Sequence, residues 1–383
     1  MQMIARLIVG ASLLLAGNAF ADDKHIAYVG TYTNGASKGI YGLRVEGGGK
    51  VTSLGLLADV PNPSFMATDD SHRFLYALSE KTAPKDATGM LSSYAIDPAN
   101  GHLRFLNRVP AHGTVTGHLT VDHTGRWLVA ANYGSGSVAV FALNADGSIG
   151  AMSDFKQHAG TSADPKRQMG PHPHEAVMSA DNRFLFVPDL GLDKVFIYRL
   201  DAATGKLTPN DPATVGAPLG FGPRHMLFDA RERFAYLLGE MGSRVIALSY
   251  DKARGALTPI QTIGTLPDGF SGENNTAELA LSADGRFLYA SNRGHDSVTQ
   301  FAIDAGTGQL KLVSNTPSGG KIPRNIAITP SGDELLAANQ DSNTITVFRR
   351  DPKTGRLKAD GQALDVPAPV CILFVPLPGA APK

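Results

Sequence analysis

The segment MGPHPHEAVMS, residues 169–179, holds two histidines of the kind that bind metals or move protons. His172 and His174 are two positions apart, so on an extended strand their side chains would point to the same face. An imidazole can serve as a metal ligand, as an acid or base near neutral pH, or as packing. The local sequence leaves all three roles open, so the elements that position the pair must decide between them.

The composition limits the classes of partner. The 383 residues include 35 basic and 35 acidic side chains, and this balance argues against a nucleic-acid partner. The single cysteine, Cys371, lies in the apolar run PVCILFVP, which predicts a buried, inert thiol and leaves no intrachain disulfide. Glycines and prolines are scattered between apolar runs, a pattern typical of many short strands.

The first residues predict an export signal. Segment 1–21 contains Arg6, an apolar run at 7–17 and an A-x-A motif that ends at Ala21. This order is typical of a secretory signal that is cleaved after the motif. The run is shorter than the roughly 20 apolar residues that span a bilayer. We therefore expect residues 22–383 to form one domain that works in the periplasm without a membrane anchor.

An internal repeat organises the rest of the chain. A polar turn followed by an apolar strand recurs six times, as DDSHRFLYALSE, DHTGRWLVAANYG, SADNRFLFVPDLG, DARERFAYLLGEMG, SADGRFLYASNRG and TPSGDELLAANQD. The copies are spaced about 50 residues apart, the period of a four-stranded propeller blade. Within each copy, a short strand such as 118–122 precedes the turn, and strands such as 287–291 and 137–143 follow it.

These units predict an all-β, seven-bladed β-propeller with four antiparallel strands per blade. A seventh unit, KHIAYVGTYTNG at the N-terminus, lacks the first strand of the pattern, and the C-terminal VCILFVP has that missing character. We expect the C-terminal strand to join the N-terminal blade and close the ring.

Polar residues gather at one end of these predicted strands. In an antiparallel blade the start of the first strand lies beside the end of the second, so both open at one mouth of the ring near its axis. The residues at those positions are Thr31, Asn62, Ser64, Glu80, His118, Asn132, Tyr133, His172, His174, Asp189, Arg224, His225, Glu240, Glu278, Asn292, Arg293, Arg324, Asn325 and Asn339. Charged groups near a narrow axis are costly unless they are paired or used, so this mouth is the predicted functional site.

The charges at this mouth weigh against a metal. Glu240 or Glu278 could complete a site with the two histidines. However, the guanidinium groups of Arg224, Arg293 and Arg324 would repel a dication, and they favour an anion together with acid–base chemistry. We expect no metal, and no fingerprint of a nucleotide or flavin cofactor is visible. Prolines on both sides of His172 make packing a stronger alternative there than at His174.

The segments GPRHMLFDARERFAYLLGE and AELALSADGRFLYASNRGHDSVTQF resemble the propeller lactonase family. That family includes the propeller-type bacterial 6-phosphogluconolactonase and the fungal carboxymuconate cyclase, and the similarity runs over essentially the whole mature chain. The resemblance implies a seven-bladed, metal-independent enzyme. The residues proposed to act in the family are a histidine, two arginines and a glutamate, which fall here on His174 (PHPHEAV), Arg224 (GPRHM), Arg293 (SNRGH) and Glu240 (LLGE).

The export signal changes the substrate that the resemblance implies. A phosphorylated lactone of the cytosol would not be available outside it, so we expect a periplasmic gluconolactonase that hydrolyses glucono-1,5-lactone or a related aldonolactone to the acid. A 6-phosphogluconolactonase and a muconate cycloisomerase of the same fold remain alternatives. A noncatalytic periplasmic binding or scaffold propeller is the alternative of another class.

For lactone hydrolysis we expect water to attack directly, because no G-x-S-x-G nucleophile elbow is present. Arg224 and Arg293 would stabilise the oxyanion, with Glu240 as base and His174 as acid, or the reverse. The residues expected to bind the sugar are His118, His172, His225, Glu278, Asn292, Asn132 and Arg324. We expect a monomer whose only partner is the small sugar lactone, with no nucleic acid and no membrane.

Overall fold

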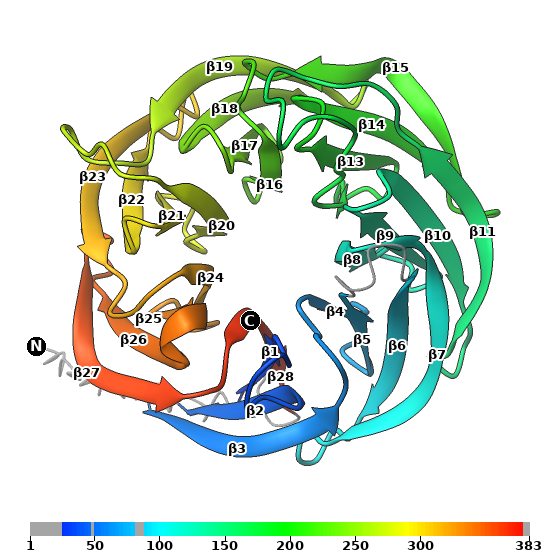
Figure 1. The fold of residues 1–383 in the computed structure, drawn as a ribbon, viewed down its shortest axis with the longest axis horizontal. Helices are drawn as coiled ribbons and strands as arrows, with labels where there is room; N and C mark the ends of the chain where they lie inside the picture. Colours follow the sequence, from blue (N-terminus) through cyan, green and yellow to red (C-terminus); the bar gives the residue numbers. More distant parts are fainter. Residues whose placement is uncertain (1–24, 47–49, 81–87, 378–383) are drawn as a thin grey trace, which may run out of the picture.

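The computed structural model describes residues 25–46, 50–80 and 88–377, and these form seven four-stranded antiparallel sheets arranged around one axis (Figure 1). The predicted seven-bladed β-propeller is confirmed. The predicted signal segment 1–21 lies outside the described residues.

Each blade runs from an innermost strand near the axis to an outermost strand at the edge (Figure 1). The first three blades in chain order are β28 (Pro369–Pro376), β1 (His25–Thr31), β2 (Gly39–Glu46) and β3 (Lys50–Asp59); β4 (Met66–Thr68), β5 (Phe74–Ser79), β6 (Thr88–Ile96) and β7 (Leu103–Thr114); and β8 (Thr116–Val121), β9 (Trp127–Asn132), β10 (Ser137–Leu143) and β11 (Ile149–Gln157).

The other four blades follow in the same inner-to-outer order. They are β12 (Val177–Met178), β13 (Phe184–Asp189), β14 (Lys194–Asp201) and β15 (Lys206–Gly216); β16 (Pro223–Phe228), β17 (Phe234–Gly239), β18 (Arg244–Asp251) and β19 (Ala256–Gly264); β20 (Asn275–Leu281), β21 (Phe287–Arg293), β22 (Ser297–Ile303) and β23 (Leu310–Pro317); and β24 (Pro323–Ile328), β25 (Glu334–Asn339), β26 (Thr344–Arg350) and β27 (Leu357–Asp365). A single 3-10 turn, η1 (Gln340–Ser342), is the one helical element of the described residues.

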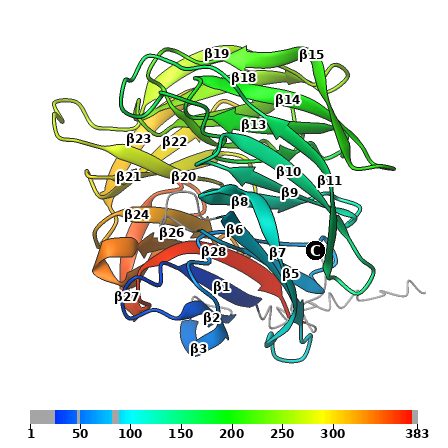
Figure 2. The same ribbon diagram turned by 45° about the vertical axis from the view of Figure 1, so that its right-hand side comes forward.

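The two ends of the chain close the ring, as the sequence predicts. Strand β28 pairs antiparallel with β1, and the register runs from His25 opposite Pro376 to Gly30 opposite Cys371. Figure 2 shows the two strands side by side, β28 in red and β1 in dark blue. Cys371 is buried in this blade, and burial raises the pKa of its thiol to about 12. Such a thiol is protonated and inert at neutral pH.

Apolar side chains between adjacent blades form the core. The second strand of each blade packs on both faces, so its sequence reads as a continuous apolar run; β9 and β25 are buried at every position. One cluster joins Phe184 and Phe186 of β13 to Met226 of β16 and Leu237 of β17, and it therefore spans two blades. Each large side chain buried in this way contributes about 1.5–3 kcal/mol.

A glycine at an outer turn fits one blade against its neighbour at several places around the ring. Gly255, in the turn between β18 and β19, has φ +66°, and a Cβ at this position would collide with the ring of Phe184 in the preceding blade. Gly205 meets Trp127 in the same way one blade earlier. The positive φ and the close ring together make glycine necessary here. Repetition of this contact explains part of the periodicity in the sequence.

Among the described residues, no helix has the length and apolar character that crossing a membrane requires.

Candidate active site

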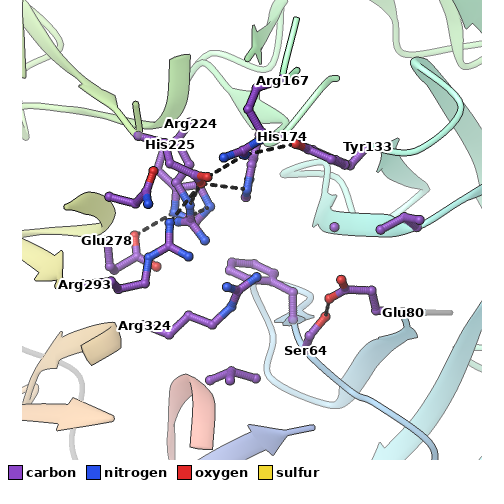
Figure 3. A pocket seen from close by; sticks show the side chains of 16 residues that line it. Ser64, Glu80, Tyr133, Arg167, His174, Arg224, His225, Glu278, Arg293 and Arg324 are labelled. Atoms are coloured by element: carbon purple, nitrogen blue, oxygen red, sulfur yellow. Dashed lines mark hydrogen bonds and ion pairs between the residues drawn. The ribbon is translucent and has the colours of Figure 1, made fainter. Parts of the chain in front are cut away.

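A cavity of roughly 340 Å³ opens at one mouth of the ring, within the size range of small-molecule sites. Figure 3 shows its side chains converging from several blades. Its lining consists of Ser64, Phe65, Glu80, Val115, Gly117, Tyr133, Arg167, His174, Arg224, His225, Glu240, Asn275, Glu278, Arg293, Arg324 and Val370. Phe65 also lines a wider hollow farther along the innermost strands, so this residue borders both spaces.

Strand pairing brings the charged residues together. In one blade Pro223 of β16 lies opposite Gly239 of β17, and the ladder is irregular just after Pro223. Arg224 lies at this irregularity, and its side chain meets that of Glu240 at the axis. In the next blade Arg293, the last residue of β21, lies opposite Asn275 of β20. These residues are far apart in the sequence, and the antiparallel register places them at one mouth.

Glu240 is the centre of the charged cluster. Its Oε2 accepts a hydrogen bond from Nε of Arg224 at 2.9 Å and lies 3.0 Å from Nη2 of Arg293. Its Oε1 accepts from Nη2 of Arg167 at 2.8 Å. Burial acts to raise the pKa of Glu240, but the surrounding cations outweigh burial and hold that pKa well below the ordinary value. Glu240 is therefore ionised at neutral pH and shared by three guanidinium groups.

Arg224 and Arg293, the more buried of the three arginines, each keep an N–H donor free for a ligand. Besides Glu240, Arg224 contacts the carbonyl oxygen of Ala277 and Nε2 of His225, and Arg293 donates from Nη2 to the carbonyl oxygen of Thr276. Nη2 of Arg224 and Nη1 of Arg293 have no partner among the described residues and are not sealed from the cavity. These two N–H groups suit a negatively charged oxygen.

His174 borders the same carboxylate. Its Nε2 lies 3.7 Å from Oε2 of Glu240, and its Nδ1 has no hydrogen-bond partner among the described residues. Burial, followed by the charge of Arg224, lowers the pKa of His174 well below the ordinary value. The ring is therefore neutral at pH 7. It is the group of this cluster that can accept a proton there.

His225 is held in one tautomer by its neighbours. An arginine only donates, so Nε2 of His225 accepts from Nη1 of Arg224 at 3.2 Å, and Nδ1 donates to Oε1 of Glu278 at 2.8 Å. The other oxygen of Glu278 accepts from Nδ2 of Asn325 at 2.7 Å. Asn325 in turn accepts from the backbone N–H of Ile372 in β28. This chain links the orientation of Arg224 to the strand that closes the ring.

The opposite wall carries a second set of polar groups. Figure 3 shows Glu80 and Ser64 across the cavity from Arg293 and Glu278. Oε2 of Glu80 accepts from Oγ of Ser64 at 2.6 Å. Arg324 extends from β24 into the space between the walls (Figure 3).

Seven of the eleven residues predicted to act in catalysis or to bind the sugar line the cavity. They are His174, Arg224, His225, Glu240, Glu278, Arg293 and Arg324.

The predicted asparagines do not reach the cavity. Asn132 is fully buried within its blade, where Oδ1 accepts from Oγ1 of Thr116 at 2.7 Å. Asn292 is also fully buried, and its Nδ2 donates to Oγ1 of Thr299 at 2.8 Å. Both side chains satisfy buried polar groups of the blade. Neighbouring residues on a strand point to opposite faces, so Tyr133 and Arg293 reach the cavity whereas these asparagines do not.

Two of the predicted histidines also lie off the cavity. His118 packs against Phe65 with ring centroids 4.0 Å apart, and its Nε2 lies 3.7 Å from Glu175. His172 donates from Nδ1 to the carbonyl oxygen of Tyr133 at 2.7 Å, and its ring stacks on the Tyr133 ring at 4.4 Å. Packing is thus the role that the contacts of His172 support. Within the described ranges, no group of three or more His, Cys, Asp or Glu side chains could hold a metal ion.

Arg167 was not among the residues predicted for the site. This residue lies between β11 and β12, in a segment outside the strands, and its side chain lines the cavity. Its Nη2 bonds Oη of Tyr133 at 3.2 Å as well as Glu240. Asp189 fixes both ends of the segment, because it accepts from Nδ1 of His158 and from the backbone N–H of His172, each at 2.7 Å. No pattern in the local sequence predicts that this side chain reaches the site.

Known proteins are similar to this chain in sequence and in architecture. A 6-phosphogluconolactonase of Bacillus subtilis (strain 168) is 36% identical over 304 residues, which make up 79% of this chain and 84% of that protein. A 6-phosphogluconolactonase of Formosa agariphila is 30% identical over 307 residues, 78% of this chain and 84% of that protein. The structure of the periplasmic gluconolactonase of Pseudomonas aeruginosa superposes with a TM-score of 0.88 at 38% identity, covering 93% of this chain and 100% of that one.

The family model described as lactonase, 7-bladed beta-propeller, matches residues 26–374. This range takes in every blade and all the charged residues of the cavity. The chain therefore belongs to the seven-bladed β-propeller lactonase family.

Proposed function

We propose that this protein hydrolyses glucono-1,5-lactone or a closely related aldonolactone to the free acid in the periplasm. The observation that carries the proposal is the ionised Glu240, shared by three guanidinium groups, with a neutral His174 at its edge. Such a cluster has an excess of positive charge where a lactone carbonyl would develop an oxyanion. It also holds a base in its unprotonated form.

The proposed reaction begins with attack of water on the lactone carbonyl carbon. The free N–H groups of Arg224 and Arg293 stabilise the negative charge that develops on the carbonyl oxygen. His174 takes the proton of the attacking water and returns it to the ring oxygen as the C–O bond breaks. The product is a hydroxy acid whose carboxylate faces the same guanidinium groups.

This assignment reverses the preferred roles of the sequence analysis, in which Glu240 was the base. Both carboxylate oxygens of Glu240 are already bonded to guanidinium groups, so neither is free to take the proton of an attacking water. The contacts instead make Glu240 the residue that orients the three guanidinium groups. It also stabilises the imidazolium that His174 becomes during the reaction.

Compartment and similarity support the choice of an unphosphorylated substrate. The N-terminal sequence predicts export, and the Pseudomonas aeruginosa protein of similar structure is a periplasmic gluconolactonase. The 6-phosphogluconolactonases among the relatives make the phosphorylated lactone the second candidate.

A panel of lactones tests the proposal. The purified protein should accelerate hydrolysis of glucono-1,5-lactone above the spontaneous rate, measured by acid release with a pH indicator, and more strongly than that of its 6-phosphate. Cell fractionation should place the protein in the periplasm. Activity should survive exhaustive chelation, because a dication would be repelled by the guanidinium groups. Failure to accelerate any lactone would favour a binding or scaffold protein, and cyclisation of a muconate would favour the cycloisomerase.

A further inference from the structure

The wall of the cavity opposite Glu240 has no part in the reaction proposed above. Its polar residues are Ser64 and Glu80, and Arg324 of another blade extends into the space between the two walls. Ser64 and Glu80 lie across the cavity from the cluster around Arg224 (Figure 3). A ligand held at the cluster would therefore present its far side to this wall.

Glu80 is fixed through one carboxylate oxygen only. Its Oε2 accepts from Oη of Tyr32 at 2.9 Å and from Oγ of Ser64 at 2.6 Å. The backbone N–H of Glu80 donates to the carbonyl oxygen of Asn62, and the carbonyl oxygen of Glu80 accepts from Nδ2 of Asn62. Oε1, in contrast, has no partner among the described residues and is not sealed from the cavity. The fold thus holds a rigid, buried carboxylate with one oxygen open to a ligand.

Arg324 offers the complementary group. Its guanidinium lies over the ring of Tyr32, 5.2 Å from the centroid. It has no hydrogen bond or ion pair with any described residue, and its nitrogens are not sealed from the cavity. Tyr32 therefore positions both the acceptor of Glu80 and the donors of Arg324.

We propose that Glu80 and Arg324 form a subsite for the hydroxyl groups of an uncharged, polyhydroxylated lactone, and that Glu80 disfavours a phosphorylated one. This inference rests on the function proposed above and specifies its substrate class. A carboxylate accepts only, so Oε1 matches the O–H donors of a sugar, and the free guanidinium matches the hydroxyl oxygens. A phosphate has no proton to offer Oε1, and its negative charge opposes that of Glu80.

The test compares Glu80→Gln with the wild type on three lactones. Glucono-1,5-lactone carries the ring hydroxyls, its 6-phosphate adds negative charge, and δ-valerolactone has the ring without hydroxyls. Because the variant loses a charged hydrogen bond, kcat/KM for glucono-1,5-lactone should fall roughly 10- to 100-fold. The loss on δ-valerolactone should be at least ten times smaller. The ratio of 6-phosphate to unphosphorylated activity should rise.

One control and one substitute variant keep the comparison interpretable. Glu46→Gln removes a partly exposed carboxylate of β2 that pairs with Lys50 at 3.6 Å, far from the cavity in the fold. It should change no ratio between lactones. If Glu80→Gln fails to fold, Arg324→Gln replaces it, with the same selective loss on the hydroxylated lactone expected.

The outcomes separate this inference from the proposed function. Equal losses on all three lactones, or no loss on glucono-1,5-lactone, overturn the subsite and leave the hydrolase intact. A wild type that hydrolyses no lactone overturns the function, and the subsite with it. A wild type that prefers the 6-phosphate also overturns the proposed discrimination.

Discussion

Nε of Arg224 donates to Oε2 of Glu240 at 2.9 Å, and both side chains are buried at the axis of the ring. Arg224 lies at the start of β16, and Glu240 directly follows the last residue of β17. Arg293 reaches the same oxygen from the adjacent blade. The electrostatics of the site therefore depend on correct packing of neighbouring blades.

Replacing Glu240 should disrupt both activity and stability. In Glu240→Gln the buried guanidinium groups lose the charge that neutralises them, which costs about 3–5 kcal/mol of the free energy of unfolding. Lactone hydrolysis should fall by at least about 100-fold, because the donors of Arg224 and Arg293 are no longer held. Urea unfolding and initial rates measure the two effects. A variant as stable as the wild type would contradict the central role assigned to this carboxylate.

The two histidines of the PHPHE motif should behave differently. His174→Asn removes the proposed base, so kcat should fall roughly 10²- to 10⁴-fold. His172→Asn is the matched control two residues away, and it should keep most of the activity because its ring stacks on Tyr133 outside the cavity. Rates of the two variants under identical conditions provide the measurement. Similar losses in both would remove the basis for choosing His174.

The pH profile should follow the lowered pKa of His174. The base must be neutral, so kcat/KM falls as the pH drops through its pKa, which burial and Arg224 hold well below the ordinary value. We expect full activity at a pH of about 6.5, where an ordinary histidine is half protonated. Hydrolysis should be followed by the disappearance of lactone, which works at any pH. Half-maximal activity at or above that pH would refute the assignment.

Stability should also fall on acidification. Burial lowers the pKa values of His118, His174 and His225, so the folded state binds fewer protons than the unfolded chain below the ordinary histidine pKa. Protonation then favours unfolding, at about 1.4 kcal/mol per pH unit for each histidine in that window. Urea midpoints measured at neutral and mildly acidic pH test this. A midpoint that rises on acidification would show that these rings are charged in the fold.

Arg167 should influence binding more than stability. Its side chain is 39% exposed, so Arg167→Met should cost less than about 1 kcal/mol of the free energy of unfolding. Loss of its bonds to Glu240 and Tyr133 should raise KM several-fold. Arg183→Met, at an exposed ion pair with Asp181, is the control and should leave KM unchanged. Steady-state kinetics on glucono-1,5-lactone distinguish the two variants, and equal KM values would exclude a role for Arg167.

Asn292 should prove important for stability alone. Asn292→Ala removes the buried hydrogen bonds that Nδ2 of Asn292 donates to the hydroxyls of Ser297 and Thr299, which should cost about 1–3 kcal/mol. The value of kcat/KM should change little, because the side chain points into the blade. Thermal unfolding and lactone assays on one preparation test this. A large loss of kcat with unchanged stability would show that Asn292 acts in the site.

The repeat made the fold predictable. Turn residues and apolar alternation locate β10 at 137–143, as the structure has it. The repeat is weakest at β12, the first strand of its blade, which is confined to Val177–Met178. Prolines at 171 and 173 lack the N–H that a strand ladder needs.

The site was only partly predictable. Strand order indicates which mouth of the ring a residue approaches, and Arg224, Glu240 and Arg293 follow from it. Strand order does not indicate which of two adjacent residues faces the axis, so Asn292 was assigned to the sugar together with Arg293. Arg167 reaches the cluster from an irregular segment, where no period constrains the position of a side chain.

The pairing of β28 with β1 has a consequence for biogenesis. When the chain is synthesised or exported from its N-terminus, β1 emerges long before β28, the strand that pairs with it. Until β28 emerges, that edge of the first sheet is free to pair with strands of other chains. The nascent chain is thus most prone to aggregation until its last strand is released. Deleting that strand should yield insoluble material rather than a six-bladed remnant.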